Sequence, residues 1–406
     1  MHRALLIGIV LALLAAAAVA ALYQRDLSRA VAGLEGRSQR VDTGFGPIEY
    51  ATAGEGAPAL VIHGSGGGFG QGLLMAEPLG ALGYRLIAPS RFGYLGTPGR
   101  ADMTIEMQAD AHAALMDRLR IDRAVIVGGS AGALSALQLA IRHPERCEAL
   151  ILLVPASYSP ERRPHESGAR SVWAERFMMA ALRADFLFWS AIHALPGTMT
   201  RLILATEPGL IEAAAPQEQA RARQILDDVF PVSRRADGLL FDSRTAGDPP
   251  PMELDRIRCP VLAVSAEDDL YGTAASARYV AANVPDGELL IYPTGGHLLV
   301  GHGDEIWRKA ASFIESARDG RRPRRRGAAA NLDLTQGSVA ARCETATGNR
   351  QMGERDDDDG HCKLHAGGRA GAAMGQRPRR ESRLGHPQVL PAVAVGAARV
   401  AGLAVA

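Results

Sequence analysis

Hydrophobic and polar residues alternate in a regular way from about residue 47 of the chain. Short stretches of aliphatic and β-branched residues are followed by longer segments whose apolar residues recur at helical spacing. Strands are expected at residues 47–53, 59–62, 85–88, 124–127 and 148–154. Helices are expected at residues 73–82, 104–119 and 133–142. This β-α alternation predicts an α/β fold with a mainly parallel central sheet and flanking helices.

The alternation stops between residues 156 and 251 and then resumes. This segment contains no convincing strand, but its helical stretches carry large apolar residues: Trp173, Phe177, Met178, Phe186, Phe188, Trp189 and Leu210. Strands at 261–265 and 288–292 and a helix at 304–317 follow it. We therefore expect one core of residues 40–155 and 252–318, with residues 156–251 inserted as a helical cap. The cap aromatics are expected to pack between cap and core rather than to contact substrate.

The first 25 residues have the pattern of a targeting segment. Residues 4–23 form an uninterrupted apolar run, long enough to span about 30 Å of hydrocarbon as a helix. Ala18-Val19-Ala20 resembles a small-residue cleavage site, so residues 1–25 are either a membrane anchor or a secretory signal peptide. Four arginines follow the run and only Arg3 precedes it, which favours a cytoplasmic body but leaves the side of the membrane open.

Residues 319–406 differ in composition from the rest of the chain. They begin with the basic run 321–326 and continue as Gly-, Ala- and Arg-rich sequence without sustained periodicity. Such a segment buries too little apolar surface to offset its ordering entropy, so we expect it to be disordered. The same composition also fits a frame-shifted reading of G+C-rich DNA. His361, Cys362 and His365 within it do not indicate a metal site.

Overall composition excludes several functional classes. The formal net charge is +1, so no nucleic-acid partner is expected. The four cysteines, at 147, 259, 343 and 362, are far apart in the sequence and form neither a disulfide framework nor a Cys₄ metal pattern.

A candidate nucleophile lies where a strand meets a helix. Gly128-Gly129-Ser130-Ala131-Gly132 fits the pattern G-x-S-x-G, with the apolar residues 124–127 before it and the helical stretch 133–142 after it. The pattern alone is weak in a glycine-rich chain, but a strand that turns sharply into a helix at this point is typical of a nucleophile elbow. We therefore predict that Ser130 is a nucleophile.

A serine hydroxyl needs a base, and the base needs an acid that orients it. Asp268 and Asp269 follow the strand 261–265, and His297 follows the strand that ends at residue 292. His302, five residues later, is an alternative base.

These motifs, in this order, resemble the α/β-hydrolase superfamily over residues 40–318. His63-Gly64-Ser65-Gly66 is similar to the family's His-Gly-x-Gly loop, in which His63 is expected to support the loop. The segment 89–94 is similar to the family's Asp-x-x-Gly-x-Gly loop, from which Ser90 and Leu95 depart. The family's Gly-x-x-Asp spacing favours Asp269 as the acid and leaves Asp268 as the alternative.

The resemblance also implies the remaining parts of the site. His297 is the expected base, and the backbone N–H groups of Ala131 and of Ser65 or Gly66 are the expected oxyanion hole. It implies a serine hydrolase of a carboxylic ester or related small carbonyl substrate that needs no cofactor and no metal. Two alternatives stay open: a carbon–carbon bond hydrolase of diketone-like acids, and a non-catalytic hydrolase-fold receptor. A cap arginine that binds a carboxylate would favour the first alternative, and Arg162, Arg170 and Arg234 are the candidates.

Overall fold

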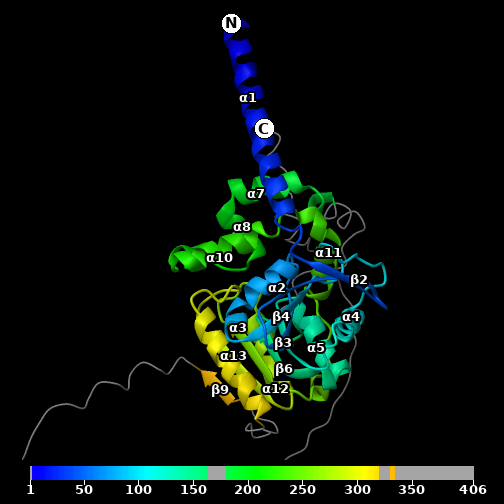
Figure 1. Ribbon diagram of the computed structural model, residues 1–406. Helices are drawn as coiled ribbons and strands as arrows, with labels where there is room; N and C mark the ends of the chain where they lie inside the picture. The colour runs from blue at the N-terminus through cyan, green and yellow to red at the C-terminus, as the bar shows by residue number, and fades with distance from the viewer. Residues whose placement is uncertain (1, 163–179, 320–329, 334–406) are drawn as a thin grey trace, which may run out of the picture. The chain divides into compact units, whose positions relative to one another are not determined.

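The computed structural model describes residues 2–162, 180–319 and 330–333, and it centres on one sheet (Figure 1). The sheet has the strand order β1-β2-β4-β3-β5-β6-β7-β8-β9. β1 pairs with β2 and β2 pairs with β4 in antiparallel fashion, and every other pair is parallel. The strands are β1 Gln39–Thr43, β2 Gly46–Ala53, β3 Ala57–Ile62, β4 Tyr84–Pro89, β5 Ala124–Gly129, β6 Cys147–Leu153, β7 Val261–Ala266, β8 Gly287–Tyr292 and β9 Ala330–Asp333.

Helices cover both faces of this sheet. Successive strand residues point to opposite faces, so Ile126 packs in the cluster with α4 and α5, whereas Val125 and Val127 pack in the cluster with α13. The core helices are α2 Phe69–Met75, α3 Glu77–Ala81, α4 Ile105–Arg118, α5 Gly132–Arg142, α12 Thr273–Asn283 and α13 Gly303–Arg318. The prediction of a mainly parallel α/β sheet with flanking helices is confirmed.

Between residues 39 and 283, local details differ from the sequence expectation in three places. The helix expected at residues 73–82 is two helices, because α2 ends before Ala76 and α3 starts anew with Pro78 in its first turn. Strand β1 was not expected, since its residues are mostly exposed and polar. Helix α12 was also not expected. It is rich in alanine and has little hydrophobic contrast between its faces.

The described residues between 156 and 251 contain helices and no strand. These helices are α7 Asp185–Ala194, α8 Pro196–Ile203, α9 Pro208–Glu212, α10 Pro216–Asp227 and α11 Ala236–Thr245. The connection between α8 and α9 contacts loops that follow the parallel strands: the Ala205 carbonyl accepts hydrogen bonds from the backbone N–H groups of Leu270 and His297. Trp173, Phe177, Met178 and Arg170 lie outside the described residues. The boundaries of the cap stay a prediction.

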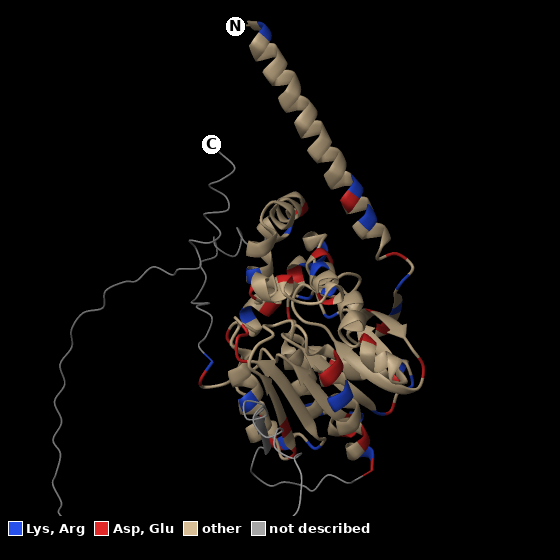
Figure 2. Cartoon of the chain, turned by 90° about the vertical axis from the view of Figure 1, so that its left-hand side faces the viewer, with Lys and Arg blue, Asp and Glu red and all other residues tan. Residues whose placement is uncertain are grey.

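The N-terminal segment is one helix, α1 His2–Ala32. Its most apolar window has a mean hydropathy of 2.9, and none of that window is buried. Figure 2 shows that the charged residues of α1 are confined to its ends. By length and composition α1 could cross a membrane, and a signal sequence would have the same features. The disorder expected for residues 319–406 stays a prediction: most of them lie outside the described residues, and residues 330–333 form the short strand β9.

Candidate active site

Ser130 occupies a strained turn between β5 and α5. Its φ angle is 50°, in the left-handed region that a residue with a side chain rarely adopts. The backbone N–H of Ser130 donates to the Leu153 carbonyl at 2.9 Å, and its carbonyl accepts from the N–H groups of Ala133 and Ala156 at 3.1 Å. Hydrogen bonds on both sides of the residue therefore hold the turn in place.

The glycines beside Ser130 are required by close packing. A Cβ on Gly132 would lie 2.4 Å from the carbonyl oxygen of His63 and 2.5 Å from that of Ile62. A Cβ on Gly128 would lie 2.7 Å from the Cβ of Ala136. The helix can approach the neighbouring strand this closely only because both positions lack a side chain.

The structure brings Ser130, His297 and Asp269 together. The Nε2 atom of His297 lies 2.9 Å from the Ser130 Oγ, and its Nδ1 atom lies 2.9 Å from the Asp269 Oδ2. A carboxylate only accepts, so Nδ1 carries the hydrogen and Nε2 presents its lone pair to the serine hydroxyl. Ser130 follows β5, Asp269 follows β7 and His297 follows β8. In the sequence, His297 is 28 positions from Asp269 and 167 positions from Ser130, so the fold brings the three side chains together.

Asp269 is buried and fully engaged in hydrogen bonds. It accepts from the His297 ring, from the backbone N–H of Tyr271 at 2.9 Å and from the hydroxyl of Thr273. Burial alone would raise the pKa of Asp269, but the His297 charge and these hydrogen bonds outweigh it and lower the pKa. The carboxylate therefore stays ionised at neutral pH.

The two alternative residues have other contacts. Asp268 accepts hydrogen bonds from the backbone N–H groups of Gly295 and Gly296, at 3.2 and 2.8 Å, and so holds the loop that carries His297. The Nε2 atom of His302 lies 2.9 Å from the Thr294 carbonyl, and its ring stacks on Tyr292 with centroids 3.8 Å apart. This geometry favours Asp269 and His297 over Asp268 and His302.

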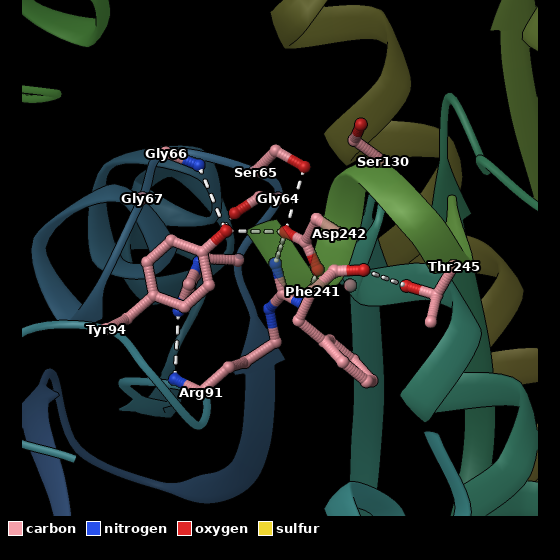
Figure 3. A network of polar contacts seen from close by, with 12 residues as sticks. Gly64, Ser65, Gly66, Gly67, Arg91, Tyr94, Ser130, Phe241, Asp242 and Thr245 are labelled. Atoms are coloured by element: carbon pink, nitrogen blue, oxygen red, sulfur yellow. Dashed lines mark hydrogen bonds and ion pairs between the residues drawn. The ribbon is translucent and has the colours of Figure 1, made fainter. Parts of the chain in front are cut away.

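The backbone N–H groups expected in the oxyanion hole differ in whether they already have a hydrogen-bond acceptor. Among the described residues, the N–H groups of Ala131 and Ser65 have no hydrogen-bond acceptor. The N–H of Gly66 instead lies 3.4 Å from the hydroxyl oxygen of Tyr94 (Figure 3). Of the two residues proposed for this loop, the geometry therefore favours Ser65.

A buried ion pair holds the Ser65 loop against the cap. Asp242, on α11, accepts from both terminal nitrogens of Arg91 at 2.8 and 2.5 Å, from the Tyr94 hydroxyl at 2.5 Å and from the Ser65 Oγ at 2.8 Å (Figure 3). The side chains of Arg91 and Asp242 are only 2% and 3% exposed. The carboxylate thus joins the loops after β3 and β4 to a cap helix.

His63 supports the same loop. Its Nε2 atom accepts from the backbone N–H of Arg91 at 3.0 Å, and burial together with the nearby Arg91 charge holds its pKa well below the ordinary value. A neutral ring is what this acceptor role requires.

Replacement of Asp242 by alanine is expected to destabilise the fold. It leaves Arg91 buried without its carboxylate, which costs about 3–5 kcal/mol in the free energy of unfolding. Asp237→Ala, on the same helix, is the matched control. Asp237 is 51% exposed and lies 3.4 Å from Arg183, so its loss is expected to cost under about 1 kcal/mol. Urea titration of both variants checks this; equal midpoints would contradict the structural role of Asp242.

Sequence reasoning missed three residues of this site: Thr273, Thr206 and Asp242. Thr206 Oγ1 accepts from the backbone N–H of Leu298, and a Cβ on Gly296 would lie 2.6 Å from its methyl group. Each of these residues has an ordinary local pattern, and only the tertiary fold brings it to the site. Within the described part of the chain, no group of three or more His, Cys, Asp or Glu side chains is placed to hold a metal.

Comparison with known proteins agrees with this fold. A family model for the alpha/beta hydrolase fold matches residues 58–303, and the chain belongs to this family of hydrolases. The chain is 36% identical to a 2-hydroxymuconate semialdehyde hydrolase of Pseudomonas putida over 276 residues, which is 65% of this chain and 89% of that protein.

Two further matches show how far the similarity extends. A protein of the same name from Pseudomonas sp. strain CF600 is 37% identical over 137 residues, which is 32% of this chain and about half of that relative, 47%. Among solved structures, an alpha/beta hydrolase fold protein from Nakamurella multipartita is 28% identical. It has a TM-score of 0.51 and covers 69% of this chain and 99% of its own.

Proposed function

We propose that this chain is a serine hydrolase of a carboxylic ester, with Ser130 as nucleophile, His297 as general base and Asp269 as the orienting acid. The observation that carries the proposal is the continuous chain of two 2.9 Å contacts from the Ser130 Oγ through the His297 ring to Asp269. A strained nucleophile turn, a base within hydrogen-bond reach and a buried carboxylate behind it are the parts that acyl transfer needs.

The reaction follows from these positions. Ser130 Oγ attacks the ester carbonyl while His297 Nε2 takes its proton, and Asp269 stabilises the imidazolium that forms. The N–H groups of Ala131 and Ser65 stabilise the negative oxygen, and each such donor is worth roughly 100- to 1,000-fold in rate. His297 then returns the proton to the leaving alcohol. In the second half, His297 takes a proton from water, whose oxygen attacks the acyl-enzyme. His297 then gives this proton to the departing Ser130 Oγ, which releases the acid and restores the free enzyme.

The principal alternative is hydrolysis of a carbon–carbon bond in a diketone-like acid. Two observations favour it: the relatives named 2-hydroxymuconate semialdehyde hydrolase, and the position of Arg162. The Arg162 guanidinium donates to the backbone carbonyls of Ser157 and Tyr271, at 3.3 and 3.4 Å. It also interacts electrostatically with the carboxylate of Asp269, which places it near the candidate active site. Its remaining N–H groups could bind a substrate carboxylate.

Paired substrates distinguish the two reactions. We expect the full chain to hydrolyse p-nitrophenyl butyrate faster than a 2-hydroxy-6-oxo-dienoic acid, and Arg162→Gln to leave the ester kcat/KM unchanged. If the dienoic acid is the better substrate, and Arg162→Gln raises its KM alone, the carbon–carbon reaction replaces the ester assignment. If neither substrate reacts, a fluorophosphonate probe decides: labelled Ser130 means a hydrolase of another acyl group, and unlabelled Ser130 means a hydrolase-fold binding protein.

We also propose that α1 is retained as a membrane anchor. Its apolar run is longer than the 7–15 apolar residues of an ordinary signal peptide, and helix α1 continues without a break through the cleavage-like residues 18–20. Extraction of membranes with alkaline carbonate tests this: an anchored chain stays in the pellet at its full length, and a cleaved one is released about 20 residues shorter.

The anchor and the tail are expected to be dispensable for chemistry. The contacts that surround Ser130, His297 and Asp269 come from residues between 63 and 302. A chain of residues 27–318 should therefore hydrolyse p-nitrophenyl butyrate with a kcat/KM comparable to that of the full chain. Steady-state kinetics on the two proteins checks this, and a folded but inactive short chain would contradict it.

A further inference from the structure

A cavity lies where the end of α1 meets the cap. It has a volume of about 310 Å³, and its lining includes Arg25, Asp26, Arg29, Trp189, His193 and Arg223. Helices α1, α7 and α10 supply these side chains. The cavity is separate from the candidate active site, since none of the residues placed there lines it.

The position of this cavity along α1 matches the surface of a bilayer. Residues 4–24 carry no charge, and at 1.5 Å per residue this stretch is about 30 Å long, the thickness of the hydrocarbon layer. Arg25 and Arg29 are the first cations beyond it, and therefore lie at the depth of the lipid headgroups. The Tyr23 ring, two residues before Arg25, packs edge-on against Phe186 and Trp189, and aromatic residues are enriched at this interface.

The charges of the cavity favour an anion. Three arginines face two carboxylates. Arg25 pairs with Asp26 and Arg223 pairs with Asp227, each at 2.9 Å, whereas Arg29 has no carboxylate partner among the described residues. A guanidinium has five N–H donors, so the paired arginines keep donors for a ligand.

Trp189 holds two other polar side chains of the cavity, those of Asp26 and His193. The Trp189 indole N–H donates to Asp26 at 3.1 Å, and its carbonyl accepts from His193 Nδ1 at 2.8 Å. The carboxylate of Asp26 thus has partners on both α1 and α7. The other ring nitrogen of His193, Nε2, lies 3.8 Å from Asp26.

From this arrangement we propose that the cavity binds the phosphate headgroup of an anionic phospholipid and so fixes the cap against the membrane surface. Two features select a lipid over a free phosphate ion: the depth of Arg25 and Arg29, and the apolar side chain beside the cavity. Phe186, whose ring stacks on the cavity residue Trp189, is 45% exposed, and acyl chains would cover it. The inference rests on the proposed role of α1 as an anchor.

Binding to the full chain in a non-ionic detergent tests the site. The probes are a short-chain diether phosphatidylglycerol, which no esterase hydrolyses, the matching diether phosphatidylcholine, and inorganic phosphate; calorimetry gives each Kd. We expect phosphatidylglycerol to bind most tightly, and Arg29→Gln and Arg223→Gln each to raise its Kd about fivefold. Arg256→Gln is the matched control, since Arg256 is also exposed and paired within one helical turn.

Two results would overturn the proposal. One is an equal Kd in all the variants, and the other is displacement of the lipid by an equal concentration of inorganic phosphate. Hydrolysis of p-nitrophenyl butyrate and carbonate extraction are measured on the same proteins. If only the headgroup site is wrong, hydrolysis and carbonate extraction still give the predicted results, and the lipid Kd values do not. If the hydrolase or the anchor assignment is wrong, the corresponding assay gives the contrary result, and the lipid Kd values stay as predicted.

Discussion

Ser130→Ala is expected to lower kcat/KM for p-nitrophenyl butyrate by roughly 10⁵-fold, because the enzyme then has no atom that can form the acyl intermediate. The residual rate should come from the oxyanion N–H groups and from substrate binding alone. Alanine removes only the hydroxyl, so the backbone hydrogen bonds that hold residue 130 to Leu153, Ala133 and Ala156 are retained. The variant should therefore fold, and circular dichroism and its melting temperature confirm that the loss is chemical.

Ser135→Ala is the matched control for this experiment. Ser135 is also buried, on α5, and its hydroxyl donates to the Gly132 carbonyl at 3.3 Å rather than to His297. We expect its kcat/KM to stay within an order of magnitude of the wild type. Equal loss of activity in both variants would place the effect in the fold and not in nucleophilic attack.

Asp269→Asn and Asp268→Asn are expected to differ strongly, although the two residues are adjacent. An amide at 269 places an N–H donor or a weaker acceptor against His297 Nδ1, which disturbs the tautomer that leaves Nε2 free, and kcat should fall about 10⁴-fold. An amide at 268 still accepts from the backbone N–H of Gly296 through its oxygen, so kcat should fall by less than about tenfold.

The pH–rate profiles of these two variants are a second test of which aspartate orients His297. In Asp268→Asn the acidic limb should keep its position, because the His297–Asp269 contact is intact. In Asp269→Asn the limb should move to lower pH, because the imidazolium loses its buried counter-charge and gives up its proton more readily. The reverse pattern, with the larger loss at 268, would make Asp268 the orienting acid and contradict the assignment.

The sequence predicts much of this fold because most of its strands are short and apolar. β5 is buried along its whole length, and the abrupt change from its residues to the alanine-rich α5 marks the position of Ser130. Strand β1 and helix α12 have no such contrast. Their positions are set by pairing with β2 and by packing on β7 and β8, which local pattern does not reveal.

The departures from the family loop have a physical explanation in the structure. Ser90 stands where the family has an aspartate, and its hydroxyl donates to Glu49 at 2.8 Å, so β2 supplies the missing carboxylate. The same carboxylate of Glu49 accepts from the backbone N–H of Gly96 at 2.8 Å. Leu95 has a φ of 51°, and its N–H donates to the carbonyl of Arg234 in the cap. The hydrogen bonds of Ser90 and Leu95 join residues about 40 and about 140 positions apart in the sequence. A local sequence pattern does not reveal contacts of this kind.

The most direct test of the account is labelling of the full chain with a fluorophosphonate probe, followed by peptide mapping. An activated serine displaces fluoride from phosphorus and keeps the label whatever acyl group its natural substrate carries. We predict stoichiometric label on Ser130 in the wild type, none in Ser130→Ala, and much slower labelling in His297→Ala. A folded wild-type chain that leaves Ser130 unlabelled would contradict the serine hydrolase mechanism and favour a hydrolase fold that binds its ligand without chemistry.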